Sequence, residues 1–188
     1  MQPESGFQTH AHQNMEMIAL VLEGELQHRD SLGHQKWIHS GEIQRMSAGT
    51  GVTYSEGNSS KTEVLHLFQI WIHPCEFELE PSYEQKSILS CSSSGLLRLI
   101  ASSDSDSGGA KIHQDVLIYL GDFQCGEKVE FKVREGRFVW IQVIRDSISI
   151  PGMSLMSGDG GLIEGVGILE IAALDSSKGA QIMVFDLP

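Results

Sequence analysis

The sequence predicts an all-β fold made of two consecutive domains. Its apolar stretches are short and are separated by turn residues about every 8–12 residues, a spacing typical of β-sandwiches and barrels. Stretches with helical periodicity are few, and 188 residues are enough for one large or two small domains. The segment SSDSDSGG at residues 102–109 has the composition of a linker, so we expect the chain to divide near residues 90–110.

The predicted strands follow from runs of β-forming residues bounded by turn signals. Residues 15–22 form an apolar run that ends at Glu23-Gly24, and residues 63–72 (EVLHLFQIWI) are long enough for a buried strand. Between them, residues 30–33 and 40–41 indicate turns, and residues 48–51 indicate a small-residue loop. Residues 96–101 are compatible with a short helix or a strand. The strands expected in the second half are residues 116–120, 128–133, 138–144, 169–174 and 181–187.

The composition is that of a globular protein and excludes several classes of function. There are 13 lysines and arginines against 25 aspartates and glutamates, which gives a net charge of −12. A direct nucleic-acid partner requires a basic face, which this charge argues against. No apolar run is long enough to span a membrane, and the N-terminus lacks a signal-peptide pattern, so we expect a cytoplasmic protein without a membrane partner. Cys75, Cys91 and Cys125 form no C-x-x-C pair, which favours reduced thiols in a reducing compartment.

Two pairs of polar residues carry the main functional signal. His10 and His12 are separated by one residue, and Tyr54 and Glu56 repeat that spacing on a second candidate strand. Residues i and i+2 of a strand face the same side, so each pair can offer two side chains to one point. If the two strands lie against each other, the four side chains converge. Three of them, the two imidazoles and the carboxylate, are ordinary ligands of a divalent transition metal.

The remaining polar residues give weaker signals. A histidine pair at this spacing also occurs by chance on exposed strands, and the residues alone leave that alternative open. Glu16 is a further carboxylate that shares the face of the histidine pair if the strand continues regularly. His66 alternates with apolar neighbours and is expected in the core or at its rim. Three histidines in or beside predicted turns are expected to be solvated: His28, His34 and His39.

Longer motifs make the sequence resemble a known family. The segment from His10 and His12 to Glu16 and Gly24 resembles the first cupin motif, and the segment from Gly41 to Asn58 resembles the second. The stretches MEMIALVLEGELQHRDSLG, IQRMSAGTGV, SEGN and QIWIHP…PSYEQK resemble the pirins, a bicupin family. The resemblance is dense over residues 6–86 and looser beyond, where it rests on a Gly-Asp-Gly turn at residues 158–160 and on the closing VFDLP.

The resemblance implies a fold and a ligand set. Pirins have two stacked antiparallel β-barrel domains of the cupin type, also called the double-stranded β-helix or jelly roll. The resemblance therefore implies an N-terminal cupin at residues 1–90 with the candidate metal site, and a C-terminal cupin at residues 91–188 without a metal motif. The family holds an iron-type metal with three histidines and a glutamate. Those positions correspond to His10, His12, Tyr54 and Glu56.

This chain departs from the family pattern in two places. Tyr54 stands where the family has its third histidine, and the chain starts almost on the His-x-His segment. Family members usually have a further segment before it that supplies strands of the first barrel. The resemblance thus implies an N-terminal barrel that is incomplete, with an open edge. Tyr54 can either bind a metal as phenolate or stay neutral and hydrogen-bond Glu56.

The resemblance implies two alternative functions. Many pirins oxidatively open flavonols such as quercetin, so the first is a metal-dependent quercetin-type 2,3-dioxygenase with an altered site. Glu56 would then act as metal ligand and catalytic base, with Fe(II) or another divalent transition metal (Cu, Ni, Mn or Zn) as cofactor and a flavonol-like aromatic substrate. Eukaryotic pirins also act as nuclear cofactors for transcription factors. The second is therefore a degenerate, non-catalytic bicupin without metal that binds a partner protein or small molecule and regulates a stress or redox response.

Overall fold

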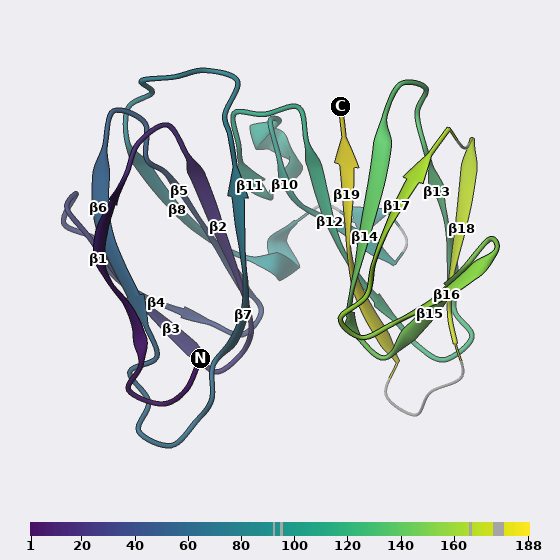
Figure 1. Ribbon diagram of the computed structural model, residues 1–188, viewed down its shortest axis with the longest axis horizontal. Helices are drawn as coiled ribbons and strands as arrows, with labels where there is room; N and C mark the ends of the chain where they lie inside the picture. The colour runs from purple at the N-terminus through teal and green to yellow at the C-terminus, as the bar shows by residue number, and fades with distance from the viewer. Residues whose placement is uncertain (92, 95, 166, 175–178) are drawn as a thin grey trace. The chain divides into compact units, whose positions relative to one another are not determined.

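The computed structural model describes residues 1–91, 93–94, 96–165, 167–174 and 179–188. It divides into two compact units (Figure 1): the first comprises Met1–Ser90 and Gly109–Gln114, and the second comprises Cys91–Gly108 and Asp115–Pro188. Within the described residues, strands dominate, and the helices are the short 3-10 turns η1 (Ile88–Ser90) and η2 (Ser105–Ser107). The all-β prediction is confirmed. None of the helices in these residues is long and apolar enough to cross a membrane.

The first unit, all of whose residues are described, consists of two antiparallel sheets. One sheet has the order β1-β6-β3-β4 and the other has the order β7-β2-β5-β8. Two facing antiparallel sheets of this kind form the jelly-roll barrel expected of a cupin domain. The strands are β1 (Gly6–His12), β2 (Glu16–Glu23), β3 (Glu25–Asp30), β4 (Gln35–His39), β5 (Glu42–Ser47), β6 (Val52–Gly57), β7 (His66–Ile72) and β8 (Ser82–Ser87). Gly109–Gln114 adds β11 (Ala110–Lys111).

The interior of the first unit contains two buried clusters of apolar side chains. One buried cluster gathers side chains from β2, β3, β4 and the chain before β7: Ala19, Val21, Leu26, Ile38 and Leu65. A second cluster gathers Met17, Met46, Ala48, Val52 and Tyr54. The tyrosine of the candidate site is therefore part of the barrel's packed interior. Because burial of these side chains fixes which face of each strand points inward, it also fixes the direction of the polar residues on the same faces.

A tight loop sets the start of the strand that carries Tyr54 and Glu56. Gly49 has φ of +45°, and a Cβ added there would lie 1.8 Å from the carbonyl oxygen of Leu79. Only glycine fits so close to a neighbouring backbone. The loop is also held by hydrogen bonds from Ala48 N to the carbonyl of Met15 and from Thr50 N to that of Leu79. The small-residue loop predicted from the sequence thus anchors β6 at a fixed register.

The second unit is also built from antiparallel sheets in its described residues. One sheet runs β10-β12-β19-β14-β17, with β9 beside β10, and the other runs β13-β18-β15-β16. Between them lies an apolar core that includes Val139, Ile141, Ile171 and Val184. The strands are β9 (Ser93–Ser94), β10 (Leu97–Ser102), β12 (Leu117–Phe123), β13 (Lys128–Lys132), β14 (Phe138–Arg145), β15 (Ser147–Ile150), β16 (Met153–Met156), β17 (Gly160–Glu164), β18 (Ile168–Ala173) and β19 (Ala180–Leu187).

Residues 90–114 differ from the expected simple linker. Residues 96–101, which the sequence left open, lie mainly in strand β10. The expected linker contains η2, capped by the Asp104 side chain, which accepts a hydrogen bond from Asp106 N. Gly109–Gln114 then packs with the first unit rather than with the second. His113 is fixed there because Glu16 accepts hydrogen bonds from its backbone N at 2.7 Å and contacts its Nδ1 at 2.8 Å.

The Glu16 contact corrects one expectation about the candidate site. The strand does not continue regularly past the histidine pair, because β1 ends at His12 and Asn14 has φ of +52° in the connection to β2. Glu16 is fully buried at the start of β2, where its carboxylate binds His113. It therefore does not share the face of His10 and His12.

Candidate metal centre

The structure brings three of the four predicted site residues together on neighbouring strands. β1 pairs with β6 in antiparallel register, and His10 lies opposite Tyr54. The ring centroid of Tyr54 lies 4.6 Å from that of His10 and 5.6 Å from that of His12. The centroids of the two imidazole rings are 5.0 Å apart. The i, i+2 spacing seen in the sequence thus places both histidines against the tyrosine ring.

Tyr54 is buried and its hydroxyl is unsatisfied. The side chain is 1% exposed, and among the described residues Tyr54 Oη has no hydrogen-bond partner. Burial, together with the nearby Glu56 carboxylate, raises the pKa of the Tyr54 phenol well above its usual value. The Gln69 amide acts in the opposite direction, but it donates its hydrogen bond to Glu56 rather than to the phenol. Tyr54 is therefore neutral, and the expected hydrogen bond from Tyr54 to Glu56 is not formed.

His12 is suited to the neutral, electron-donating form, and the contacts of His10 fix its ring orientation. Burial, and to a lesser degree the neighbouring His10, lowers the pKa of His12. His12 Nε2 is buried and has no hydrogen-bond partner in the described part of the chain. His10 Nδ1 lies 2.7 Å from the carbonyl oxygen of Gln8, an acceptor that fixes the proton on Nδ1 and leaves Nε2 with its lone pair. A metal-binding histidine commonly has this arrangement, with one ring nitrogen bonded to a backbone carbonyl.

Glu56 lies two residues beyond Tyr54 on β6, where the side chains of Gln44 and Gln69 donate hydrogen bonds to it. It is 4% exposed and lies opposite Phe7 on β1. Gln44 Nε2 donates a hydrogen bond to its Oε1, and Gln69 Nε2 donates one to its Oε2 at 2.7 Å. Within the described residues it forms no hydrogen bond or ion pair with His10 or His12. A carboxylate has about four lone-pair positions, so Glu56 retains capacity for a further ligand.

His28 is a buried part of this site, contrary to the expectation that it is solvated. Its side chain is inaccessible to solvent, and β3 places it opposite Glu56 in the β3–β6 register. Nδ1 lies 3.4 Å from Glu56 Oε1, and Nε2 lies 3.1 Å from Asp30 Oδ2. Burial lowers the pKa of His28, but the hydrogen bonds and charges of Glu56 and Asp30 outweigh it and raise the pKa above its usual value. The imidazolium, a donor at both nitrogens, satisfies both carboxylates.

The other histidines named from the sequence lie away from this cluster. His34 is partly exposed and His39 is exposed, as expected for residues near turns. His66 is exposed at the start of β7, so it is a rim residue and not a core residue. Sequence reasoning also missed Gln44 and Gln69, which are the two amide donors to Glu56. Their positions inside the apolar strands β5 and β7 were the available signal, because a polar residue facing a barrel interior needs a partner there.

The donor set fits a divalent metal in its chemistry, although the ligands are not gathered at one point. Among the described residues, no three His, Cys, Asp or Glu side chains are grouped as a ready metal-binding set. The two imidazoles have an electron pair available, and His12 Nε2 is a buried atom that lacks a partner. Two histidines and one carboxylate are a recurring set for non-haem Fe(II) and similar ions. The residues His10, His12 and Glu56 therefore fit such an ion, and the neutral Tyr54 lies among them.

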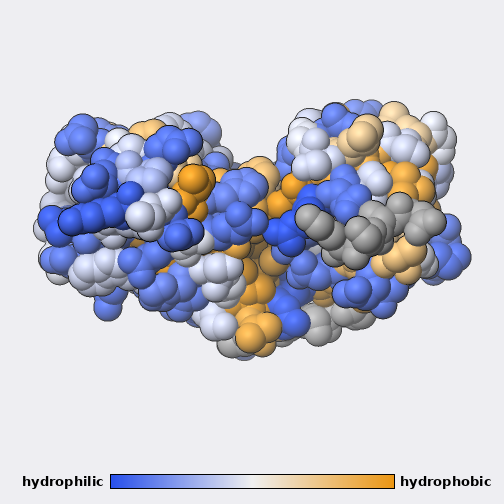
Figure 2. All heavy atoms as spheres, turned by 90° about the horizontal axis from the view of Figure 1, so that it is seen from below, coloured by the Kyte–Doolittle hydropathy of each residue, from blue (hydrophilic) through white to orange (hydrophobic). Residues whose placement is uncertain are grey.

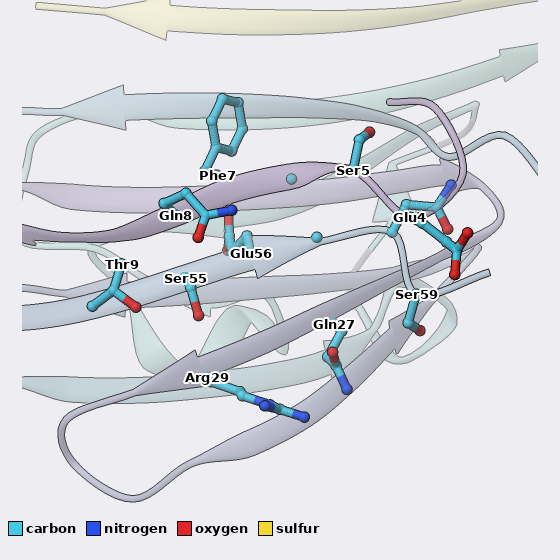
Figure 3. A pocket seen from close by; sticks show the side chains of 13 residues that line it. Glu4, Ser5, Phe7, Gln8, Thr9, Gln27, Arg29, Ser55, Glu56 and Ser59 are labelled. Carbon is cyan, nitrogen blue, oxygen red and sulfur yellow. The ribbon is translucent and has the colours of Figure 1, made fainter. Parts of the chain in front are cut away.

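Several cavities of the first unit border the site, one of them lined by His12. One, of about 390 Å³, is lined by residues of β1, β3 and β6 that include Phe7, Arg29 and Glu56. Figure 3 shows Phe7 and Glu56 on one side of this sheet, with Ser55, Gln27 and Arg29 on the other. The second cavity, of about 430 Å³, is lined by Met1, Ser5, Gly6, Phe7, Leu67 and Gln69. Gln69, which donates a hydrogen bond to Glu56, is one of its lining residues. The cavity therefore extends from the side chains of Phe7 and Leu67 to a residue that contacts Glu56.

The rest of the molecule offers less chemistry. On the face shown in Figure 2, hydrophilic residues cover most of the visible surface of the first unit, in keeping with the net charge of −12. Cys75 and Cys125 are exposed, Cys91 is buried, and none of the three forms a disulfide. The core of the second unit is a continuous apolar cluster of side chains. Its described interior therefore does not reproduce the polar cluster of the first unit.

Comparisons with known proteins agree with this architecture. The family described as Pirin matches residues 1–72, and the quercetinase C-terminal cupin domain matches residues 99–187. A protein named quercetin 2,3-dioxygenase from Escherichia coli K12 is 39% identical over 183 residues, which are 97% of this chain and 77% of that protein. A pirin-like protein from Caulobacter vibrioides is 30% identical and is covered over 76% of its length.

Solved structures show the same relationship. The crystal structure of YhhW from Escherichia coli superposes with a TM-score of 0.92 at 37% identity and covers all of this chain and 78% of its own. A second structure, of the bacterial pirin YhhW in complex with nickel(II), superposes with a TM-score of 0.90 at 37% identity and 79% coverage of that chain. Together, the family matches, the level of identity and the shared bicupin fold show that this chain belongs to the pirin family.

Proposed function

We propose that this chain is a metal-dependent dioxygenase of the flavonol, quercetin type, with a site altered by Tyr54. The observation that carries the proposal is the cluster of His10, His12 and Tyr54, in which the buried His12 Nε2 and Tyr54 Oη lack hydrogen-bond partners among the residues that the structure describes. Unsatisfied buried polar atoms are rare, and they commonly mark a bound group. The name of the E. coli relative, quercetin 2,3-dioxygenase, supports the same chemistry.

His10, His12 and Glu56 are the residues that would hold the metal. The neutral state of Tyr54 disfavours binding through a phenolate, so the tyrosine would remain next to the metal as a hydrogen-bond donor. Fe(II) suits a set of two histidines and one carboxylate, and Ni, Cu, Mn and Zn share these donor types. The nickel(II) complex of the related YhhW supports a divalent ion. When bound, such an ion supplies a centre at which flavonol and dioxygen are held together and developing negative charge is stabilised.

The protein's own residues have defined parts in this reaction. Glu56, which is 4% exposed, would accept the proton of the flavonol 3-hydroxyl. Gln44 donates a hydrogen bond to one carboxylate oxygen of Glu56 and Gln69 donates one to the other. The apolar cavity beside Phe7 and Leu67 has the size range of small-molecule sites and would receive the flat aromatic rings.

A second candidate function is a non-catalytic bicupin that binds a partner protein or small molecule in a stress or redox response. The observation that favours it is the absence, within the described residues, of a gathered set of three His, Cys, Asp or Glu ligands. Glu56 is already held by amide donors, and Tyr54 occupies the position of a third histidine. The exposed thiols of Cys75 and Cys125 would be accessible to oxidants in such a role.

Metal content and turnover separate the two functions. The full chain would be purified without chelators, analysed for metals, and assayed with quercetin under air after loading with Fe(II), Ni(II), Cu(II) or Mn(II). A dioxygenase binds about one metal per chain and consumes quercetin with uptake of oxygen. Absence of stoichiometric metal and of turnover with all four ions would contradict the enzyme proposal and favour the binding protein. A ferric phenolate absorption band lost in Tyr54→Phe would instead show that Tyr54 is a ligand.

A further inference from the structure

Glu56 is connected to the surface of the first unit by a continuous series of buried hydrogen bonds. His28 contacts Glu56 through Nδ1 and Asp30 through Nε2, at 3.4 and 3.1 Å. Asp30 Oδ2 in turn lies 2.9 Å from Nδ1 of His34, whose side chain is about one third exposed. Both nitrogens of His28 are engaged, so its ring cannot bind a metal without breaking one of these contacts. In this series His28 lies behind Glu56, and its ring stacks on that of Tyr54 with a centroid distance of 5.8 Å.

Asp30 is the fixed end of this series. Its Oδ1 accepts hydrogen bonds from the backbone N of Leu32 at 3.0 Å and of His34 at 2.9 Å, while Oδ2 faces both imidazoles. Four donors thus surround one fully buried carboxylate. An aspartate that bonds the backbone two and four residues ahead closes the following turn on itself. The orientation of His28 is therefore set by a rigid turn at residues 30–34.

A second connection reaches Glu56 from the same region. The Tyr83 ring packs against both His28 and His34, with centroid distances of 5.0 and 4.9 Å. Tyr83 Oη donates to Oε1 of Gln44 at 3.2 Å, and Gln44 Nε2 donates to Glu56. The Gln44 amide is thereby held with its nitrogen toward the carboxylate. Two of the donors that hold Glu56, His28 and Gln44, are thus oriented by residues that do not touch it.

We propose that His28, fixed by Asp30, is a positioning residue that holds the Glu56 carboxylate in one orientation for its part in the site. The inference rests on the proposed role of Glu56 as ligand and base. A glutamate side chain has several rotamers, and a ligand or base that is free to rotate spends little time in the productive one. Burial of a histidine between two carboxylates costs desolvation energy that an apolar residue would avoid. A role in orienting Glu56 explains why a histidine is present at this position despite that cost.

Substitution at position 28 tests the proposal. His28→Leu removes both contacts, and His28→Asn keeps a donor near the position of Nδ1 that can still reach Glu56. His39→Leu is the matched control, because it removes an exposed histidine from the adjacent strand β4. We expect His28→Leu to weaken Ni(II) affinity, measured by calorimetry, about 10- to 100-fold. We expect kcat for quercetin to fall with little change in KM, partial recovery of both quantities in His28→Asn, and no change in His39→Leu.

Crystal structures of the metal-free variants make the result independent of activity. We expect a single ordered orientation of the Glu56 carboxylate in the wild-type protein and several in His28→Leu. An unchanged, single orientation in His28→Leu, or Ni(II) affinity equal to wild type, would overturn the positioning role. If His28→Leu does not fold, as judged by circular dichroism, the same comparison is made with His28→Asn, in which loss of the Asp30 contact loosens Glu56. A wild-type protein that orders Glu56 through His28 but neither binds metal nor turns over quercetin would contradict the proposed function and leave the positioning role intact.

Discussion

Tyr54 lies directly opposite His10 across the β1–β6 pair, and its ring packs against both His10 and His12 while its hydroxyl contacts no hydrogen-bonding atom of the described chain. The tyrosine thus fills a position at which a third imidazole would complete a three-histidine set. Because the phenol is neutral, it contributes bulk and one donor but no strong ligand. The Tyr54 ring therefore forms part of the surroundings of both imidazoles.

We expect Tyr54→His to strengthen metal binding. The new imidazole would project from β6 opposite His10 of β1, and a third nitrogen ligand requires no loss of a proton at neutral pH. Affinity for Ni(II) or Fe(II), measured by calorimetry in the absence of oxygen, should rise by at least about tenfold, with a parallel gain in quercetin turnover. Tyr54→Phe is the control and should leave the affinity near that of the wild type. Equal affinities in Tyr54→His and Tyr54→Phe would show that position 54 does not contribute to the metal site.

Tyr54→Phe should increase the stability of the first unit. A buried polar group without a partner costs about 1–3 kcal/mol, and replacement of the hydroxyl by hydrogen removes that cost without leaving a large cavity. The free energy of unfolding, measured with urea, should rise by about 1 kcal/mol. Tyr83→Phe is a matched comparison, because the single Tyr83 hydroxyl hydrogen is shared between Oε1 of Gln44 and Oε1 of Gln85, each 3.2 Å away, and its removal should destabilise the protein. A decrease in Tyr54→Phe would mean that the hydroxyl has a partner such as bound water.

The sequence predicted the all-β architecture and the two i, i+2 pairs of the site for reasons that are local, but not the register of the two strands or the separation of Glu56 from the histidine pair. Strand spacing and turn residues are local properties, and the small-residue loop at residues 48–51 fixes where β6 begins. From these, the i, i+2 spacing of His10 with His12 and of Tyr54 with Glu56 gave the correct inner faces. The pairing of His10 with Tyr54 followed once the two strands were adjacent.

What the sequence did not reveal depends on contacts between distant segments. His28 was expected to be solvated because Asp30 indicates a turn, yet β3 extends to Asp30 and places His28 inside the barrel, where its Nδ1 lies 3.4 Å from Oε1 of Glu56, 28 residues away. Glu16 was placed beside the histidine pair, but its partner is His113, which is 97 residues away. Neither contact leaves a periodic signal along the chain, so composition and spacing could not indicate them.

Stability should depend on pH through His28. Its pKa is raised on folding, so the folded protein binds this proton more tightly than the unfolded chain does. The stabilisation from His28 is fully present below the unfolded value of about 6.5 and is lost as the pH rises through the higher folded value. The free energy of unfolding should therefore decline above neutral pH, and His28→Asn should show a smaller decline. Parallel curves for the two proteins in urea titrations between pH 6 and pH 9 would contradict this assignment.

The second unit should depend on one buried carboxylate. Asp186, 3% exposed on β19, accepts hydrogen bonds from Arg134 Nη2 at 2.8 Å and from Arg137 Nε, and Arg137 also donates to the Asp115 side chain. Asp186→Ala would leave the largely buried Arg137 without its main counter-charge, and loss of one partner of a buried ion pair costs about 3–5 kcal/mol. Removal of the exposed Lys128–Glu170 pair by Glu170→Gln should have a much smaller effect, because solvent screens it. Urea denaturation of both variants compares the two losses. Similar values would mean that Asp186 is screened by solvent as effectively as Glu170, and that the β14–β19 strand pair is held by its backbone hydrogen bonds and apolar contacts alone.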